Sequence, residues 1–375
     1  MKVLFDYQAL SGQNYGGVSR IYVELLNRIP NSECSILFST NHYISKIHQK
    51  KILSTKLLSS FKNDIPSKLQ NIVNLSYSVN KLTKSKFDVF HPTYYKPYFL
   101  PFLKKKPFVI TILDMIHENY LQKVDASKAI TNTIENKIIL MERAEQIIAI
   151  SQSTKDDIIK LNPNINPEKI SVIHLANSVS PIENNKPSFS EMLENKKYIL
   201  FVGRRWFYKN FKKCIEALAP LIANTDRLYF VCAGGGTLTI EEKAHLNKLK
   251  ILNKIIQVPF NNDEDLAYLY KNAEFFIFPS EYEGFGIPVL ESFSCGCPTL
   301  LNNATSLPEV GGDGAIYFDI NKPKTVLEAA ENILTNNIAK NEIIQKGYYR
   351  LKEFTWDRCA NEHQKIYNKV ISSCK

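Results

Sequence analysis

Short apolar segments recur along the whole sequence and alternate with longer amphipathic stretches. The short segments are rich in β-branched and aromatic residues, and the stretches between them are long enough to form helices. Two parallel strands need a crossover connection, usually a helix, so this alternation predicts parallel sheets covered by helices. The expected strands are 2–7, 34–40, 88–93, 107–114, 146–151 and 169–175, followed by 198–203, 228–233, 255–260, 275–280, 298–301 and 315–319.

The strands fall into two series, and we predict one domain for each. With 375 residues the chain exceeds the size that a single hydrophobic core normally supports. Residues 176–197 are polar, contain proline and lack apolar periodicity, so we interpret them as a linker. The predicted α/β architecture has two Rossmann-like domains, 1–180 and 181–355, whose parallel sheets face each other across a cleft. A final helix at 356–375 is expected to pack back on the first domain.

Hydropathy and cysteine usage predict a cytoplasmic protein. The sequence has no unbroken apolar stretch of about 18 or more residues, and Met1 leads through Lys2 into an expected strand rather than into a signal peptide. The seven cysteines are odd in number and irregularly spaced, so we expect reduced, mostly buried thiols. Cys295 and Cys297 lack a second pair or nearby histidines, and no metal site is predicted.

The net charge of +10 is concentrated in the first half of the chain. Residues 1–180 contain 23 Lys and Arg against 14 Asp and Glu, whereas residues 181–375 contain 24 against 23. Basic clusters lie at 45–64 and at 94–108, where lysines stand beside aromatic residues. Three interpretations remain open: a solvated face whose aromatics pack on the core, an anionic membrane surface, or nucleic acid.

A glycine pair follows the first expected strand. Gly16 and Gly17 open an amphipathic helix that begins near Val18. Free backbone N–H groups and the positive end of the helix dipole would face a ligand there, and a phosphate group is the expected ligand. The pair is also compatible with an ordinary tight turn.

A basic loop follows the first strand of the second series, which ends at Gly203. Arg204 and Lys209 flank this loop, and Asn210 is the expected N-cap of the next helix. Cations at a helix start oppose the helix dipole and are stabilised by an anion, so Arg204 and Lys209 are predicted to bind one diphosphate. The neighbouring Arg205 is expected to be a surface charge.

The segment EGFGIPVLE places two carboxylates, Glu283 and Glu291, behind a buried strand. Pro288 suits the first turn of a helix, so residues 284–286 lie just before its N-terminus, where the backbone can approach a ligand. A diphosphate repels carboxylates, so we expect Glu291 to bind a ribose diol and Glu283 to bind hydroxyls of a sugar. Taken alone, Glu283 would be interpreted as a solvated acid and Glu291 as a partner of the helix dipole.

Together these segments resemble the family 4 glycosyltransferases, retaining enzymes of the GT-B fold. EGFGIPVLE matches the Glu-x7-Glu signature of the family, FVGRRWFYKN its glycine-arginine loop with a lysine six residues after the glycine, and YGGVSR its amino-terminal glycine loop. Further matches are AISQSTKDDI, VCAGGG, LAYLYKNAEFFIFPSEYEGFG and SLPEVGGDGAIYFD. The likeness covers nearly the whole chain and is strongest to the branch that builds bacterial surface polysaccharides, often mannosyltransferases that use GDP-mannose.

The resemblance implies roles for individual residues. Arg204 and Lys209 would bind the diphosphate and, with Glu283 on the donor sugar, form the catalytic group, while Glu291 would bind the ribose. The other residues that it assigns to the donor are Gly16, Gly17, Gly203, Val258, Pro259, Gly284, Phe285 and Gly286. The two amino-terminal glycines would close over the diphosphate from the other domain, and Val258 and Pro259 would lie near the base.

One position departs from the family pattern. The family commonly has His-Asp after the fourth strand, where this sequence has Leu113 and Asp114. Either the histidine is dispensable in this branch, or His117 replaces it from the following turn. We assign Asp114 and His117 to the sugar or acceptor side.

The resemblance further implies a retaining transfer of a hexose, with mannose from GDP-mannose as the expected donor. The acceptor would be a glycan or lipid-linked saccharide in cell-surface polysaccharide synthesis, such as O-antigen or capsule. We expect no cofactor and no metal, since bound cations replace it, and Asp263 to Asp265 are expected to begin a helix. A peripheral location on the inner face of the cytoplasmic membrane is a further expectation.

Three alternatives come from other functional classes. A sugar-nucleotide epimerase of the same fold would convert its substrate without an acceptor. A nicotinamide oxidoreductase is disfavoured because no compact G-x-G-x-x-G follows an early strand. A nucleic-acid-binding protein would explain the basic first half but not the two acids of EGFGIPVLE, so nucleic acid is not an expected partner.

Overall fold

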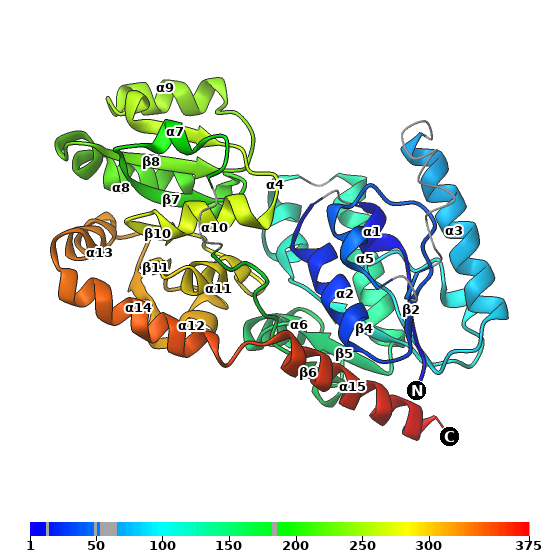
Figure 1. Cartoon of the computed structure of the whole chain (residues 1–375). Coiled ribbons are helices and arrows are strands. Elements are labelled where there is room, and N and C mark those ends of the chain that lie inside the picture. The colour runs from blue at the N-terminus through cyan, green and yellow to red at the C-terminus, as the bar shows by residue number, and fades with distance from the viewer. Residues whose placement is uncertain (13–14, 49–50, 53–65, 126, 182–185, 375) are drawn as a thin grey trace. The chain divides into compact units, whose positions relative to one another are not determined.

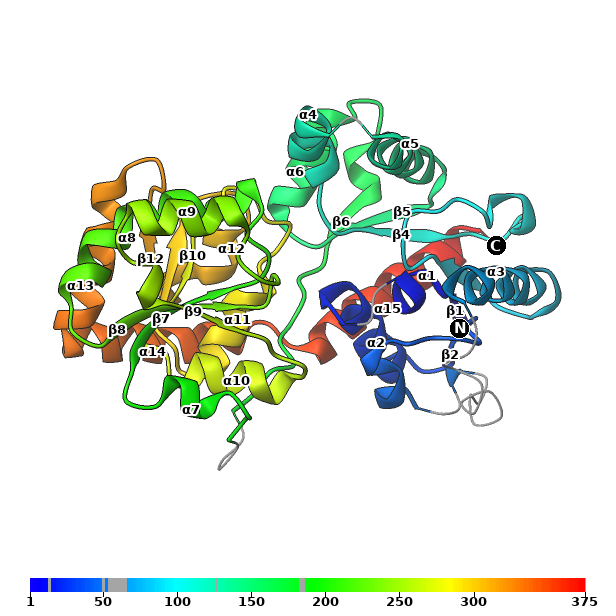
Figure 2. The ribbon, with the colours of Figure 1, turned by 90° about the horizontal axis from the view of Figure 1, so that it is seen from above.

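The computed structural model describes the chain except for residues 13–14, 49–50, 53–65, 126, 182–185 and 375, drawn in grey in Figure 1. Much of the basic cluster at 45–64 therefore lies outside the described residues. The chain forms two compact units, Figures 1 and 2. Unit 1 comprises Met1–Leu175 and Trp356–Lys375, and unit 2 comprises Ala176–Thr355. Both have the α/β architecture that the alternating pattern predicts.

Unit 1 contains two three-stranded parallel sheets, with the orders β2-β1-β3 and β4-β5-β6. An isolated bridge between Phe90 and Phe108 links β3 to β4. Pro107, directly before the bridge, has no N–H to donate, which limits pairing at this point. The strands are β1 Val3–Phe5, β2 Ser32–Cys34, β3 Val89–His91, β4 Val109–Ile112, β5 Gln146–Ala149 and β6 Ile170–Val172.

The helices of unit 1 follow its strands. They are α1 Gln8–Gly12, α2 Gly17–Arg28, α3 Ser67–Lys84, α4 Gln122–Val124, α5 Lys128–Arg143, α6 Gln152–Leu161 and α15 Trp356–Ser373. In the part of unit 1 that the structure describes, the short turns are η1 His42–Lys46, η5 Leu100–Phe102, η6 His117–Leu121 and η7 Pro167–Lys169.

Strand β2 lies earlier than the segment 34–40 that the sequence predicts. The Asn74 side chain, on α3, accepts hydrogen bonds from Leu37 N and Phe38 N, both at 2.9 Å, and donates to Phe38 O at 2.8 Å. The backbone at Leu37 and Phe38 therefore bonds to a side chain, whereas Ser35 N still donates to Phe5 O of β1 at 2.9 Å. The prediction is wrong because the competing partner lies far away in the sequence.

The aromatic residues between 94 and 108 lie mainly in the core of unit 1. Tyr95, Phe99 and Phe108 are at most 4% exposed, whereas Lys104 and Lys105 are exposed. The aromatic side chains of this segment therefore belong mainly to the core, and its exposed charges are Lys104 and Lys105.

The last helix, α15, belongs to unit 1 although it follows unit 2 in the sequence. Arg28 on α2 donates to Asp357 at 2.9 Å, and Figure 2 shows α15 beside α2. The buried His91 ring bonds through Nδ1 to the Tyr367 hydroxyl at 2.7 Å and through Nε2 to Thr111 Oγ1 at 3.0 Å. These bonds join the carboxyl-terminal helix to β3 and β4 within one core.

Unit 2 is built on a six-stranded parallel sheet of order β12-β11-β10-β7-β8-β9. The order reverses at β7, which pairs with β8 on one side and β10 on the other. Ligands of open α/β sheets bind at the carboxyl ends of the strands beside such a reversal, so the loops after β7 and β10 are the expected binding loops. The strands are β7 Lys197–Val202, β8 Leu228–Ala233, β9 Ile255–Val258, β10 Phe275–Phe278, β11 Thr299–Asn302 and β12 Ile316–Phe318.

Helices cover this sheet, whose strands are apolar and largely buried. They are α7 Ser190–Leu193, α8 Phe211–Asn224, α9 Ile240–Lys248, α10 Asp263–Lys271, α11 Ile287–Ser294, α12 Leu307–Gly311, α13 Pro323–Thr335 and α14 Asn337–Leu351. The short turns are η8 Phe207–Lys209, η9 Leu252–Lys254 and η10 Gly312–Gly314.

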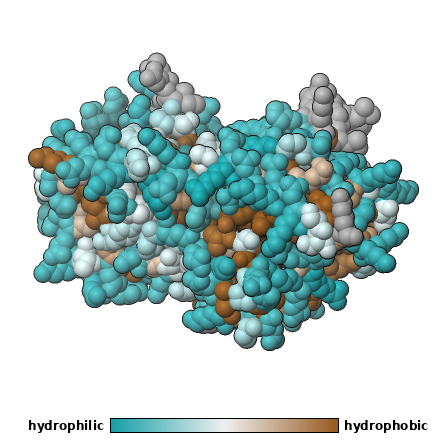
Figure 3. All heavy atoms as spheres, turned by 90° about the horizontal axis from the view of Figure 1, so that it is seen from below, coloured by the Kyte–Doolittle hydropathy of each residue, from teal (hydrophilic) through white to brown (hydrophobic). Residues whose placement is uncertain are grey.

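Figure 3 shows the hydropathy of the side chains on one face of the molecule. The face in Figure 3 is mainly hydrophilic, with hydrophobic side chains in limited groups. Within the described part of the chain, no helix combines the length and the apolar character that a membrane crossing requires. The cysteines are free, six of them buried and Cys374 exposed, as expected for reduced thiols.

A buried histidine on α15 predicts a pH-dependent stability. His363 is 1% exposed, and burial lowers its pKa from 6.5 to about 4, against the opposing effect of its hydrogen bond to the Cys359 carbonyl. Between these values the unfolded chain binds a proton that the folded chain does not, so the free energy of unfolding should fall as the pH drops from about 7 to about 4. The contribution of this group should be on the order of 3 kcal/mol.

Denaturant unfolding of the wild type and of His363→Gln at several pH values in this range measures the effect. The free energy of unfolding of the variant should depend clearly less on pH. A part of the dependence should remain, because burial also lowers the pKa of His91. An equally steep dependence in the variant would contradict the assignment.

Candidate functional site

Two glycine-containing loops of unit 2 meet at the carboxyl ends of β7 and β8. Gly203 has a φ of +109° and donates its N–H to Ala233 O at 2.9 Å. Gly235, in the loop after β8, has a φ of +75°, and a Cβ there would lie 2.6 Å from Gly203 O. The close approach of the two loops therefore requires glycine at position 235. Sequence reasoning does not assign Gly235 to the site, although the segment VCAGGG is the signal that contains it.

Arg204 and Arg205 differ in their surroundings. The exposed Arg204 places its guanidinium 5.1 Å from the centroid of the Trp206 ring. The Arg205 side chain is only 4% exposed and donates to Glu242 Oε1 at 2.8 Å and to Thr237 O at 3.0 Å. The expectation of a surface charge at Arg205 is wrong, because α9 and the loop before it supply a buried site for its guanidinium.

A cavity of about 610 Å³ opens beside these loops. Its lining comes from the loops after β7 and β8 and from the start of α9: Arg204, Arg205, Trp206, Gly235, Gly236, Thr237, Thr239 and Glu242. A concave surface that combines an exposed guanidinium, an indole and open backbone suits a polar, anionic ligand.

Lys209 ends the turn η8, and its ammonium group pairs with the Glu283 carboxylate. The two side chains are 16% and 15% exposed. Asn210 stands at the start of α8, but its backbone is left-handed and its side chain does not cap the helix. Its Nδ2 instead donates to Pro279 O at 3.2 Å. The N-cap prediction is wrong in this respect, and Asn210 ties the loop after β7 to the loop after β10.

The loop after β11 holds the backbone around Glu283 in place. Glu283 N donates to Thr305 Oγ1 at 3.0 Å, and Ser306 Oγ donates to Glu283 O and to Phe285 O, both at 2.9 Å. Phe285 is 3% exposed, and Gly284 before it is partly exposed. Sequence reasoning does not identify Thr305 or Ser306, because nothing local marks them as partners of a different loop.

Helix α11 carries the second acid of EGFGIPVLE and has Pro288 in its first turn, as predicted. Gly286, directly before the helix, has a φ of +104°, and a Cβ there would lie 3.0 Å from the Leu307 side chain. Glu291 is 5% exposed, and its Oε2 accepts a hydrogen bond from the Tyr270 hydroxyl at 3.1 Å. Burial, and then the neighbouring Glu291, raise the pKa of Tyr270. Tyr270 is a partner that the sequence does not reveal.

Val258 and Pro259 lie at the end of β9. Val258 is buried, and its carbonyl accepts from Gly234 N at 3.1 Å, whereas Pro259 is exposed. Because β7, β8 and β9 are neighbouring parallel strands, this pair lies at the same edge of the sheet as Gly203.

In unit 1, Gly16 and Gly17 stand at the start of α2 as predicted. Gly17 is exposed, while Gly16 O accepts from Ser19 Oγ at 3.0 Å and from Arg20 N at 3.2 Å. Arg20 is buried, and its Nη2 donates to the Tyr43 hydroxyl at 2.6 Å. A buried guanidinium in the first turn of α2 adds positive charge to the end of the helix that favours anions.

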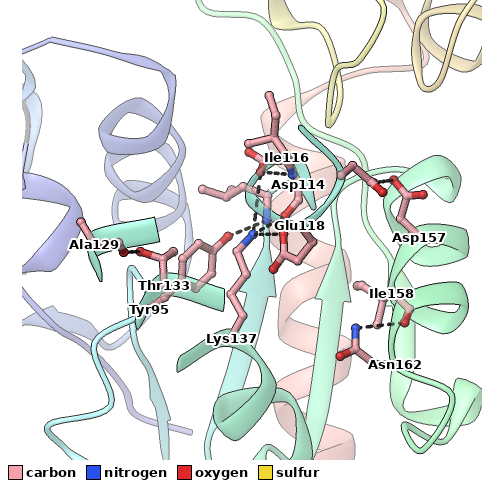
Figure 4. Close-up of polar contacts among 12 residues, drawn as sticks. Tyr95, Asp114, Ile116, Glu118, Ala129, Thr133, Lys137, Asp157, Ile158 and Asn162 are labelled. Carbon is pink, nitrogen blue, oxygen red and sulfur yellow. Dashed lines mark hydrogen bonds and ion pairs between the residues drawn. The ribbon is translucent and has the colours of Figure 1, made fainter. Parts of the chain in front are cut away.

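Asp114 and His117 follow β4 and lie around a buried lysine, as Figure 4 shows for Asp114, Glu118 and Lys137. The Lys137 side chain on α5 is fully buried, and its Nζ donates to Asp114 O at 2.8 Å and to Glu118 Oε2 at 3.1 Å. The Asp114 carboxylate accepts from Ile116 N at 3.0 Å. Lys137 and Glu118 thus fix the loop that presents Asp114, and sequence reasoning identifies neither.

His117 begins η6, a π-helical turn of a kind frequent at functional sites. Burial, and then the positive charge of Lys137, lower the pKa of His117, so its imidazole is neutral near pH 7. Leu113, at the position where the family commonly has histidine, is 7% exposed, and its N–H donates to the Tyr95 hydroxyl at 2.9 Å.

The predicted residues of unit 2 lie on loops at the carboxyl edge of its sheet and on α11, and Lys209 and Glu283 are in direct contact. Arg204 lines the cavity described above, whereas Lys209, Glu283 and Glu291 are not among its lining residues. Gly16, Gly17, Asp114 and His117 belong to unit 1. Asp263 begins α10, as predicted, after Asn262 as the N-cap. Among the residues that the structure describes, no group of three or more His, Cys, Asp or Glu is arranged to hold a metal ion.

Two family models match the chain. Residues 183–350 match the model described as glycosyl transferases group 1, and residues 15–176 match the model described as glycosyltransferase family 4.

Relatives and solved structures agree with these matches. The O-antigen chain mannosyltransferase B of Escherichia coli is 28% identical over 240 residues, which are 60% of this chain and 61% of that protein. The O-antigen chain mannosyltransferase RfbU of Salmonella typhimurium is 31% identical over 196 residues, or 52% of each chain. The match thus spans between half and two thirds of these relatives. The solved structure of Anabaena HepE in complex with UDP and glucose has a TM-score of 0.72 to this chain at 15% sequence identity. The superposition covers 98% of this chain and 99% of HepE, so the two proteins share a fold.

Proposed function

Because the chain belongs to the glycosyltransferases of group 1 and family 4, we propose that it transfers a hexose from a nucleoside-diphosphate sugar to a glycan or lipid-linked acceptor. The observation that carries the proposal is the pairing of Lys209 with Glu283, on the two loops that flank the reversal of strand order. Arg204 lies on the same loop as Lys209. A guanidinium and an ammonium suit a diphosphate, and a carboxylate suits the hydroxyls of a sugar.

Mannose from GDP-mannose is the donor that we favour, and synthesis of a bacterial cell-surface polysaccharide is the setting. Two relatives are named as O-antigen chain mannosyltransferases, and they support both parts of the proposal.

The chemistry would be a retaining transfer without a metal ion. The acceptor oxygen would attack the sugar from the face that the nucleotide leaves, and a phosphate oxygen would take the proton. Arg204 and Lys209 would stabilise the charge that grows on the diphosphate, with the N–H groups at Gly16 and Gly17 as further donors. Glu283 would accept hydrogen bonds from the sugar.

Other residues would position the substrates. Tyr270 would orient Glu291 toward the ribose hydroxyls, since its hydroxyl already bonds to Oε2 of that carboxylate. Asp114, held by Lys137, and the neutral His117 would serve the sugar or the acceptor from unit 1.

Peripheral contact with an anionic membrane is a further part of the proposal. Lys104 and Lys105 are exposed in unit 1, and α3 exposes Leu69 and Ile72, which are 49% and 59% exposed. Exposed lysines attract anionic lipid, and apolar side chains insert at the headgroup boundary.

A panel of nucleotide sugars tests the proposed activity. GDP-mannose should raise the melting temperature of the wild type more than UDP- or dTDP-sugars do, since a ligand of the folded state stabilises it.

Arg204→Ala should lower kcat/KM by about 100-fold or more through lost charge stabilisation. The matched control is Arg227→Ala, because Arg227 precedes β8 at the opposite edge of the sheet and its side chain is 72% exposed. Equal kinetics of the Arg204 variant and the control would remove the assignment.

Metal independence is tested by chelation. Transfer measured in the presence of EDTA should equal transfer without it, because Arg204 and Lys209 provide the positive charge that a metal would otherwise supply. Loss of transfer in EDTA and its recovery on addition of manganese would refute the proposed chemistry.

Membrane contact is tested by co-sedimentation with vesicles that do or do not contain phosphatidylglycerol. Binding should require the anionic lipid, weaken with salt and fall in the double variant Lys104→Glu/Lys105→Glu. The matched control is Lys243→Glu/Lys248→Glu on α9, where both lysines are exposed. Binding that ignores lipid charge, salt and these two lysines would exclude this surface.

A further inference from the structure

The ion pair between Lys209 and Glu283 joins two residues with different proposed tasks. Lys209 is assigned to the diphosphate and Glu283 to the transferred sugar, and the structure shows them in contact with each other. Both side chains are more than four-fifths buried, and the Glu283 backbone is held by Thr305 and Ser306. A diphosphate that binds Lys209 therefore comes close to a negative charge that has little freedom to withdraw.

We propose that Glu283 makes the donor site select an intact nucleoside-diphosphate sugar over the free nucleoside diphosphate, through repulsion and through competition for Lys209. This inference rests on the proposed function, in which Lys209 binds the donor diphosphate. It assigns Glu283 a role in specificity and in product release, in addition to its contact with the sugar.

The free nucleoside diphosphate and the intact sugar nucleotide differ in the charge of the phosphate that would lie next to Glu283. The terminal phosphate of a free nucleoside diphosphate has a second ionisation with a pKa of about 6, and esterification by the sugar removes it. Near pH 7.5 the free diphosphate thus carries roughly one more negative charge than the intact donor. In a partly buried site the repulsion by a carboxylate is stronger than in bulk water, so the free diphosphate is penalised more.

The intact donor offsets the repulsion in a way that the free diphosphate cannot. Its sugar supplies hydroxyl groups, which donate hydrogen bonds to a carboxylate, and hydrogen bonds to a charged acceptor are stronger than those between neutral groups. The Lys209 ammonium has three N–H donors, so it can bind a phosphate oxygen and Glu283 at once, and the remaining lone pairs of the carboxylate can accept from these hydroxyls. After transfer the hydroxyls leave with the sugar, and Glu283 again favours its pair with Lys209, which promotes release of the nucleotide.

The test measures two dissociation constants in the wild type and in Glu283→Gln. Calorimetric titration uses GDP with GDP-mannose, and UDP with UDP-glucose, as probe pairs at about pH 7.5. Glutamine keeps the size and a hydrogen-bond acceptor but removes the charge. The variant should bind the free diphosphate about threefold to tenfold more tightly and should gain no affinity for the matching sugar nucleotide.

A pH series supplies a readout that a purely structural role of Glu283 would not change. In the wild type, the ratio of the two dissociation constants should shrink as the pH falls from about 7.5 to about 5.5, because the terminal phosphate is protonated. In Glu283→Gln this pH dependence should be much weaker. The matched control is Glu274→Gln, which breaks an ion pair of similar burial, to Lys340 at 2.7 Å, at the start of β10. The control should leave both affinities unchanged.

The outcomes separate this inference from the proposed function. If neither probe pair binds, or if Arg204→Ala does not weaken binding, the proposed function fails and the inference fails with it. If binding depends on Arg204 but Glu283→Gln leaves the affinity for the free diphosphate unchanged or weaker, only this inference is overturned.

Discussion

The reversal of strand order at β7 is the constraint on which the candidate site depends. β7 pairs with β8 on one side and with β10 on the other. The loops after β7 and β10 therefore start at the same edge of the sheet but lead in opposite directions, toward β8 and toward β11. The space that opens there is bridged by side chains. Asn210 Nδ2 donates to Pro279 O, Glu281 N donates to Tyr208 O at 2.8 Å, and Lys209 pairs with Glu283. Hydrogen bonds and an ion pair therefore join the two loops. The sheet positions the loops, and these contacts fix their side chains.

The sequence predicts this fold well where local pattern and tertiary structure agree. Each buried strand of unit 2 corresponds to an apolar run in the sequence, and Pro288 lies in the first turn of α11 as expected. Predictions fail where a distant partner decides the outcome. Part of the segment after β2 bonds to the Asn74 side chain instead of a strand, and Arg205 is buried by carbonyls of another loop. The spacing of EGFGIPVLE locates the two acids but gives no sign of Tyr270 or Ser306, because contacts between loops leave no periodicity in the sequence.

The departure from the family pattern at Leu113 acquires a physical context in unit 1. Leu113 packs where a polar imidazole is common, yet the turn that follows contains its own polar group around Lys137. A buried ammonium is stable only with hydrogen-bonding partners, and the Asp114 carbonyl and the Glu118 carboxylate provide them. The loop that presents Asp114 is therefore fixed by an internal charge pair rather than by a residue at position 113.

Pairing with carboxylates also explains why the loop after β7 can carry three cations, Arg204, Arg205 and Lys209. Arg205 is neutralised by Glu242, and Lys209 by Glu283, so the loop is not destabilised by unpaired charges in partly buried positions. Arg204 is exposed and can meet an approaching anion first. Because Lys209 is already largely removed from water, exchanging one anionic partner for another requires less additional desolvation than burying a solvated lysine would. In the proposed function, the ion pair therefore keeps a partly buried cation in place for the diphosphate before any ligand arrives.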